Sequence, residues 1–254
     1  MRNSFFAIRE RVKFRIIRPL LLKAGSWLGQ YSIDGDRPIF NNNNFKAAKT
    51  LEANWEGIQN ELKSVLHFQN NMPSLQEIQQ EQNVLNQDDN WKTYFFYGFG
   101  IKATGNCQSC PFTTSVLESI DGMKTAFFSI LSPGKHIPAH RGIYKGLIRM
   151  HLGLVIPGNA GDCKMRIENE YIYWQEGKVE VFDDTYEHEV WNNTEEIRVV
   201  LLIDIIRPFK RPYSFVNNWL VNLIGNSSYV KEAMKNHQKW EASFHKKVIA
   251  ESAN

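Results

Sequence analysis

Residues 133–157 read PGKHIPAHRGIYKGLIRMHLGLVIP, and this stretch decides how the rest of the chain is interpreted. Its second half, residues 146–157, has the aliphatic composition of a buried β-strand and is bounded by glycine and proline. A core strand does not need polar side chains, yet this one carries Arg149 and His151 two positions apart. Because side chains alternate between the two faces of a strand, both are expected on the same face. The pattern therefore predicts a core strand with a polar function on one face.

Further strand-like runs lie on both sides of this stretch. Short turns such as PGNAGD, EGK and NNTEE separate them, and several short strands at this spacing are typical of a β-sandwich or barrel. The runs are 91–100, 124–131, 163–170, 170–175, 178–183, 188–192 and 197–206. Together they predict a single β-barrel core.

Helical patterns flank this core. Residues 41–66 repeat apolar side chains at helical spacing and predict one amphipathic helix, and residues 113–120 predict a short helix with a threonine cap. The overall plan is one α+β domain with three parts. These are an N-terminal helical flank at 1–90, the β core at 91–208 and C-terminal helices at 209–254.

Composition and cysteine usage narrow the function classes. The 254 residues are 43% hydrophobic and 22% charged, which are ordinary globular values that argue against disordered and fibrous classes. A net charge of +3 is too small to indicate nucleic-acid binding by itself. Cys107, Cys110 and Cys163 do not make a disulfide framework, so a reducing, cytoplasmic compartment is expected. Cys107 and Cys110 form a CxxC pair, but without a second pair a structural role is favoured over a redox or zinc site.

The first 23 residues form a basic amphipathic segment. Residues 1–23 contain seven arginines and lysines and a single acid, alternating with apolar side chains. Two interpretations stay open: the segment lies on an anionic membrane surface, or it is a solvated helix packed on the domain. No uninterrupted apolar run reaches membrane-spanning length, and no secretory signal is expected.

Two histidines far apart in the sequence suggest a metal site. His140 and His188 each lie at a strand edge beside a polar turn, and distant strands become neighbours in a barrel. Two imidazoles brought together there suit a first-row transition metal, and non-haem iron oxygenases combine two histidines with one carboxylate. Spacing alone leaves the alternative of two structural histidines open.

The ordered run of motifs resembles a known family. The segments FFSILSPGKHIPAHRG (127–142), LIRMHLGLVIP (147–157) and IRVVLLIDIIRP (197–208) resemble the aspartyl/asparaginyl β-hydroxylase family, over roughly residues 95–208. That family comprises iron(II)- and 2-oxoglutarate-dependent dioxygenases on a double-stranded β-helix, a jelly-roll or cupin-like core. It includes the peptidyl aspartate hydroxylase of animals and bacterial enzymes that hydroxylate acyl chains of lipid A and ornithine lipids.

The resemblance implies specific roles for residues of this chain. It implies that His140 and His188 bind Fe(II), and that Arg198 pairs with the distal carboxylate of the co-substrate 2-oxoglutarate. A guanidinium suits that task because its planar donors match a carboxylate. Ser129, Arg149 and His151 match further co-substrate contacts, and dioxygen is the second co-substrate. The polar face of the 146–157 strand is therefore expected to line the barrel interior.

One departure concerns the third metal ligand. Many iron dioxygenases have a carboxylate two positions after the first histidine, where this chain has Gly142. The resemblance leaves two solutions open, because water or a nearby acid such as Asp183, Asp184 or Glu187 can fill that coordination position. The segment 182–188 is expected to set a turn that orients His188 rather than to bind the metal directly.

Three functions are compatible with these features. The first is hydroxylation of an acyl chain in a membrane lipid, with peripheral contact to the inner face of the membrane through residues 1–23 and 210–224. The second is β-hydroxylation of aspartyl or asparaginyl residues in a peptide, or of a small amino-acid derivative. The third, motivated by Gly142, is a non-catalytic β-barrel binding module. The HIPAHRG motif favours the lipid branch.

Overall fold

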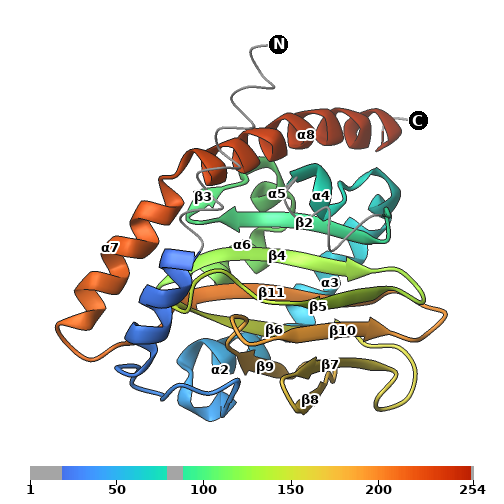
Figure 1. The fold of residues 1–254 in the computed structure, drawn as a ribbon. Coiled ribbons are helices and arrows are strands. Elements are labelled where there is room, and N and C mark those ends of the chain that lie inside the picture. The colour runs from blue at the N-terminus through green and yellow to red at the C-terminus, as the bar shows by residue number, and fades with distance from the viewer. Residues whose placement is uncertain (1–18, 79–87, 253–254) are drawn as a thin grey trace.

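Two antiparallel β-sheets face each other in a computed structural model that describes residues 19–78 and 88–252 (Figure 1). Within these residues the larger sheet has seven strands in the order β1-β9-β6-β11-β4-β2-β3, and the smaller sheet has four in the order β5-β10-β7-β8. The larger sheet comprises β1 (Ile39–Phe40), β2 (Trp91–Gly98), β3 (Ile101–Lys102), β4 (Met123–Leu131), β6 (Leu147–Val155), β9 (Val179–Phe182) and β11 (Arg198–Ile206). The smaller comprises β5 (His136–His140), β7 (Cys163–Ile167), β8 (Glu170–Tyr173) and β10 (His188–Asn192). The structure confirms the predicted α+β class and jelly-roll-like core.

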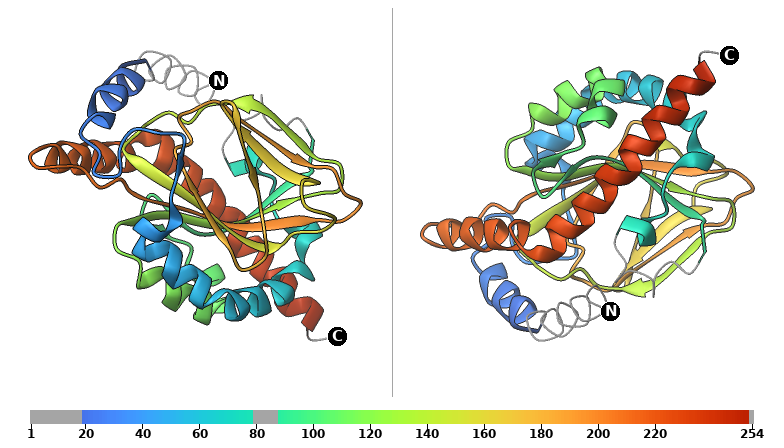
Figure 2. Two further views of the ribbon diagram at one scale, coloured as in Figure 1. Left: turned by 90° about the horizontal axis from the view of Figure 1, so that it is seen from below. Right: turned by 90° about the horizontal axis from the view of Figure 1, so that it is seen from above.

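Helices surround the larger sheet and extend beyond it (Figures 1 and 2). They are α2 (Lys46–Ala53), α3 (Trp55–Leu66), α4 (Leu75–Ile78), α5 (Thr104–Ser109), α6 (Pro111–Glu118), α7 (Tyr213–Gly225) and α8 (Ser228–Ser252), with 3-10 turns at Asn42–Asn44 and Gln69–Asn71. Residues 19–29 are also helical. In the described part of the chain no helix is both long enough and apolar enough to cross a bilayer.

Strict alternation along the strands separates two apolar layers. On β11, Val199, Leu201 and Ile203 join the cluster under the helices, whereas Val200 and Leu202 join the cluster between the two sheets. This two-residue period is the one that pleated strands impose. Arg198 lies in register with the inward-facing set, so the larger sheet presents its polar side chains toward the smaller sheet.

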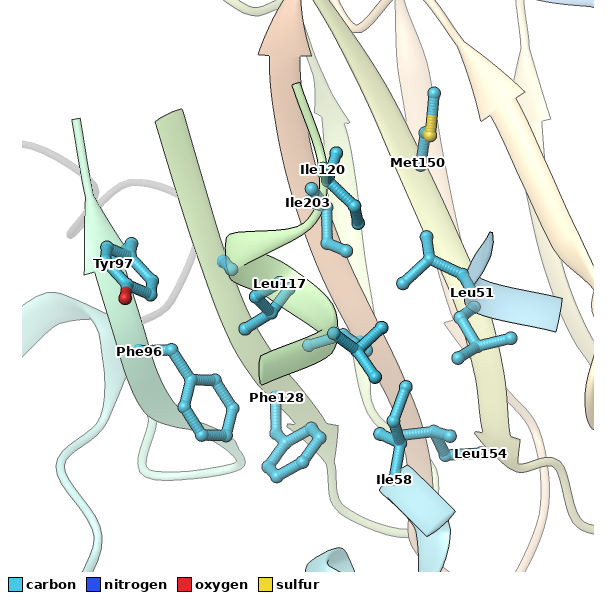
Figure 3. Close-up of a cluster of buried hydrophobic side chains, with 14 of the residues drawn as sticks. Leu51, Ile58, Phe96, Tyr97, Leu117, Ile120, Phe128, Met150, Leu154 and Ile203 are labelled. Atoms are coloured by element: carbon cyan, nitrogen blue, oxygen red, sulfur yellow. The ribbon is translucent and has the colours of Figure 1, made fainter. Parts of the chain in front are cut away.

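The outer apolar layer anchors the helices to the larger sheet. Leu51 and Ile58 from α2 and α3 and Leu117 from α6 are fully buried against the outward-facing residues of β2, β4, β6 and β11 (Figure 3). Burying such side chains contributes about 1.5–3 kcal/mol each to folding. This layer makes the larger sheet a rigid support for the side chains on its inner face.

Two predicted helices differ from the observed ones. The helix predicted over 41–66 is two helices that meet at Asn54, whose backbone departs from helical geometry (φ −118°, ψ 8°). The Asn54 side chain donates a 2.7 Å hydrogen bond to the Thr50 carbonyl, which stabilises the end of α2. The helix predicted over 113–120 with a threonine cap begins at Pro111 and has no side-chain cap. A proline at the first helical position explains the earlier start, because its fixed φ suits that position.

Candidate active site

His140 and His188 are brought face to face by strand pairing. They are direct cross-strand partners of β5 and β10, which places both side chains on the same face of the smaller sheet. Their ring centroids are 4.0 Å apart and the rings are tilted by 52°. The two histidines predicted as metal ligands, 48 positions apart in the sequence, therefore meet in space.

The backbone selects the tautomer of both rings. Nδ1 of His140 lies 2.9 Å from the Pro138 carbonyl oxygen, and Nδ1 of His188 lies 2.9 Å from the Tyr186 carbonyl oxygen. A carbonyl only accepts, so each Nδ1 carries the proton and each Nε2 presents a lone pair. Burial lowers the pKa of both rings, and the neighbouring His140 helps to lower the pKa of His188 to about 3. Both imidazoles are thus neutral at pH 7, the state that binds a metal ion.

Buried neutral histidines predict acid sensitivity. Burial lowers the pKa of His188 to about 3 and that of His237 to about 4, whereas an unfolded histidine titrates near 6.5. Below pH 6.5 the unfolded chain therefore binds more protons, and the free energy of unfolding of the metal-free protein decreases by about 1.4 kcal/mol per pH unit for each ring. Urea unfolding between pH 7 and pH 5 measures this slope. His237→Gln is expected to make it shallower, with the exposed His67→Gln as the control.

The carboxylate of Asp184 occupies the space that a side chain at position 142 would enter. A Cβ added at Gly142 would collide with both carboxylate oxygens of Asp184, and the Gly142 N–H donates a 2.7 Å hydrogen bond to the Asp184 carbonyl. Burial raises the pKa of Asp184 to about 6, while the guanidinium of Arg149 opposes that rise. The acid absent from the first motif is thus supplied to the same region by the turn before His188.

Arg149 orients that carboxylate. Its Nη1 lies 3.0 Å from Oδ2 of Asp184, and its Nε and Nη2 donate hydrogen bonds of 2.8 and 3.0 Å to the two oxygens of Asp204. Although burial alone would lower it, the two carboxylates raise the pKa of Arg149. Arg149, predicted as a co-substrate contact, is here bound to two acids.

Gly142→Ala tests the space taken by Asp184. The new methyl group displaces the Asp184 carboxylate, so we expect weaker metal binding and a loss of about 1–3 kcal/mol in unfolding free energy. Gly225→Ala is the matched control, because its added Cβ meets its nearest neighbour at an ordinary 3.5 Å. Metal titration by calorimetry and denaturant unfolding read out the two effects. Equal metal affinities of Gly142→Ala and wild type would contradict this interpretation of Asp184.

Arg198 is a buried cation without a counter-ion among the described residues. Its side chain is 1% exposed, and its Nε and Nη1 have no hydrogen-bond partner in that part of the chain. Its guanidinium lies over the ring of Trp174 at 4.5 Å, a cation–π contact that orients its plane. Burial lowers the pKa of Arg198 to about 10. An unpaired buried guanidinium is costly for a fold, so it indicates a site built for an absent anion.

Polar side chains of neighbouring strands lie on the same inner face as Arg198. His151 is buried with both ring nitrogens unpartnered within the described residues, and burial followed by the nearby arginines lowers its pKa well below the usual value. Ser129, on the adjacent β4, accepts a 3.0 Å hydrogen bond from the indole of Trp91. The structure therefore brings Ser129, His151 and Arg198, three residues that the family resemblance named, to one face of the larger sheet.

A buried ion-pair network holds the turn that leads into His188. Asp183 is fully buried, accepts hydrogen bonds from Thr185, and pairs with Nη1 of the fully buried Arg207 at 2.6 Å. Lys145 lies 3.2 Å from the same carboxylate oxygen and 2.6 Å from Asp36. Thr185, Arg207 and Lys145 therefore all contact the carboxylate of Asp183. These contacts are consistent with the expectation that this segment orients His188.

Three partners of the site were not identified from the sequence: Trp91, Trp174 and Asp204. The sequence pattern could have identified Asp204. It is the acid in an otherwise aliphatic strand, six residues after Arg198, and therefore lies on the same face as Arg198. Trp174 looks like an ordinary core residue in the sequence. Cys107 and Cys110 are buried on and next to α5, where burial raises the pKa of both thiols, which supports their structural interpretation.

The polar side chains of the site can be compared with the metal ion and acidic ligand that the sequence predicts. Two neutral imidazoles with free Nε2 lone pairs suit a first-row divalent metal ion, although no group of three or more histidine, cysteine, aspartate or glutamate side chains among the described residues is arranged to hold one. The unpaired guanidinium of Arg198 suits the carboxylate of a second ligand, and the orphaned nitrogens of His151 offer it one further donor and one acceptor. The two imidazoles therefore supply part of a metal-binding set, and the guanidinium of Arg198 matches an acidic ligand.

Comparison with known proteins gives the family. Residues 52–208 match the family model described as aspartyl/asparaginyl beta-hydroxylase. The chain is 41% identical to the ornithine lipid ester-linked acyl 2-hydroxylase of Rhizobium tropici over 221 residues, which cover 87% of this chain and 79% of that protein. It is 31% and 30% identical to the aspartyl/asparaginyl beta-hydroxylases of Mus musculus and Homo sapiens, over 72% of this chain but 26% of each of those proteins.

The matched region contains the facing histidines, the carboxylate at Gly142 and the unpaired arginine described above. The chain is therefore a hydroxylase that belongs to the aspartyl/asparaginyl β-hydroxylase family.

Proposed function

We propose that this hydroxylase is an Fe(II)- and 2-oxoglutarate-dependent dioxygenase that acts on the acyl chain of a membrane lipid. The observation that carries the proposal is the pairing of two neutral, facing histidines with a buried arginine that has no counter-ion among the described residues. A metal ion alone would explain the histidines but not Arg198. An acidic co-substrate beside the metal explains both.

His140 and His188 would hold the metal through Nε2, and the Asp184 carboxylate beside Gly142, paired with Arg149, would add negative charge near them. Bound Fe(II) and 2-oxoglutarate supply the oxidising chemistry, in which dioxygen converts 2-oxoglutarate to succinate and carbon dioxide while a substrate C–H bond becomes C–OH.

The remaining polar residues orient the co-substrate. Arg198 donates hydrogen bonds to the distal carboxylate of 2-oxoglutarate, with Trp174 fixing the plane of the guanidinium. Ser129 and His151 lie on the same inner face and provide the contacts expected of them there. Asp204 holds Arg149, and Arg149 in turn holds Asp184.

The lipid substrate class rests on similarity. The Rhizobium tropici relative, named for acyl hydroxylation of ornithine lipid, matches over most of both chains. The animal relatives match over only a quarter of their length, so hydroxylation of an aspartyl or asparaginyl residue in a peptide is the second candidate. The third candidate, a non-catalytic binding module, predicts no conversion of 2-oxoglutarate.

Lipid mass spectrometry tests the substrate class. Total lipids from cells that express the wild type or His188→Ala are compared for species that carry one additional oxygen. We expect such a species only with the wild type. Identical lipid profiles, together with Fe(II)-dependent formation of succinate by the purified protein, would move the assignment to peptide or amino-acid substrates. Absence of succinate formation would contradict the dioxygenase assignment itself.

A further inference from the structure

Exposed apolar side chains are concentrated at one end of the molecule. Of the ten large apolar side chains exposed in the described part of the chain, seven lie on two segments, residues 19–33 and α7. Single exposed apolar residues are normal on a soluble surface, whereas a concentration of them marks an interaction site. We call this surface the apolar end. It consists of Leu20, Trp27, Ile33, Phe215, Val216, Trp219 and Leu223.

Helix α7 presents a continuous apolar stripe to solvent. Phe215, Trp219 and Leu223 follow one another at intervals of four residues and are 62%, 63% and 54% exposed. Residues four apart lie on one face of a helix. The opposite face of α7 packs against the rest of the protein, where Asn217 and Val221 are buried. The exposed stripe is therefore additional to what α7 needs for packing.

The two segments of the apolar end contact each other. The ring of Tyr213 stacks on that of Tyr31 at 3.6 Å and meets the ring of Trp27 edge-on at 5.5 Å. Figures 1 and 2 show residues 19–29 and α7 on the same side of the molecule, both projecting beyond the sheets. The aromatic contacts make one surface out of two segments that lie about 190 positions apart in the chain.

The charge around the apolar end is positive. Lys23, Lys210 and Arg211 are exposed, and neither residues 19–33 nor residues 210–227 contain an aspartate or glutamate. Tryptophan side chains favour the boundary between lipid headgroups and acyl chains, and basic residues at that level are attracted to anionic lipids. A surface that combines exposed tryptophans, aliphatic side chains and lysine or arginine without acids matches an anionic bilayer in both respects.

The apolar end is joined to the candidate active site. Residues 141–146 follow the metal-ligand candidate His140 directly. Within them, the Tyr144 hydroxyl donates a 2.8 Å hydrogen bond to Oδ1 of Asn217 on α7, and Nδ2 of Asn217 donates one of 3.0 Å to the Gly146 carbonyl. Residues 19–29 approach the same loop closely, because a Cβ added at Gly25 would lie 3.0 Å from Lys145.

We propose that the apolar end docks on an anionic lipid bilayer and thereby holds the loop after His140 against the membrane. The docking itself stands on the surface described above. Its purpose, delivery of an acyl chain from the bilayer to the site, rests on the proposed function. Residues 1–18, with their basic amphipathic sequence, lie outside the described residues.

Flotation of the full chain with vesicles tests the docking. Vesicles of phosphatidylglycerol and vesicles of phosphatidylcholine are compared for the wild type and for Phe215→Gln/Trp219→Gln. We expect binding to phosphatidylglycerol, and a decrease of about tenfold or more in the partition coefficient of the variant. Tyr171→Gln/Tyr173→Gln is the matched control, because it removes two aromatic rings of 48% and 49% exposure from β8, on the smaller sheet. This control is expected to bind like the wild type.

Three results would overturn the docking proposal. They are absence of vesicle binding by the wild type, equal binding by the α7 variant, and a dimer in light scattering that the α7 substitutions convert to a monomer. The third would identify the apolar end as a contact between two copies. Vesicle-free calorimetry of 2-oxoglutarate binding separates this question from the proposed function. The α7 variant is expected to retain wild-type 2-oxoglutarate affinity, whereas a wild type that binds vesicles but neither binds nor converts 2-oxoglutarate would count against the function alone.

Discussion

Arg198→Met is expected to remove 2-oxoglutarate binding and, in the ligand-free protein, to raise stability. Binding loses a charge-assisted contact between a guanidinium and a carboxylate in a buried site, which costs about 3 kcal/mol or more, equivalent to about 100-fold in affinity. The free energy of unfolding of the ligand-free protein increases, because Arg198 is buried with Nε and Nη1 unpartnered among the described residues. Methionine is an unbranched apolar side chain that removes this desolvation cost, so the free energy of unfolding rises by about 1–3 kcal/mol.

The opposite signs distinguish a ligand-binding arginine from a structural one. Arg149→Met is the matched control, because Arg149 lies on the same inner face but is bound to Asp204 and Asp184. Its removal leaves two buried carboxylates unpaired and is expected to lower the free energy of unfolding by about 3–5 kcal/mol. Calorimetric titration with 2-oxoglutarate and denaturant unfolding measure the two quantities. A loss of stability in Arg198→Met similar to that in Arg149→Met would mean that Arg198 is a structural residue.

His188→Ala is expected to abolish both metal binding and turnover. The two ligand-competent nitrogens meet because β5 and β10 pair His140 with His188, and a single remaining imidazole leaves the metal with too few protein ligands. We expect metal-dependent thermal stabilisation to disappear and turnover to fall by at least about 100-fold. His140→Ala is expected to behave in the same way.

A second histidine on the same strand pair provides the control. His136 stacks on Trp191, and its Nε2 donates a 2.7 Å hydrogen bond to Oε1 of Glu189 on the exposed face of the smaller sheet, away from the site. His136→Ala should therefore retain metal-dependent stabilisation and turnover. Normal turnover in both His140→Ala and His188→Ala would show that the metal ligands have been wrongly assigned.

The alternation of side chains along the strands explains why several candidate site residues lie on the inner face of the larger sheet. Arg149, His151 and Arg198 occur at positions where alternation alone places them with the inward-facing residues, and the two apolar clusters divide β11 in the same way. Short strands bounded by turns predicted a sandwich or barrel, and the family resemblance predicted the jelly-roll form of it, because a pleated strand with one polar and one apolar face has few ways to bury the apolar face. Three short strands, β1, β3 and β5, were not predicted from the sequence, and β5 is interrupted by Pro138.

By itself, the sequence determined the class of the fold and the alternation of faces along the strands, and the family resemblance supplied the candidate residues for binding a metal and an acid. The alternation depends on a two-residue period, which is a local property of the strand. Tertiary structure alone decided which of two inward-facing arginines is paired with acids and which has no counter-ion among the described residues. It also decided that Asp184 occupies the space beside Gly142, 42 positions earlier, and that residues 19–33 and α7 form one apolar surface. Those outcomes depend on distances between segments far apart in the chain, which only the packing of the sheets and helices sets.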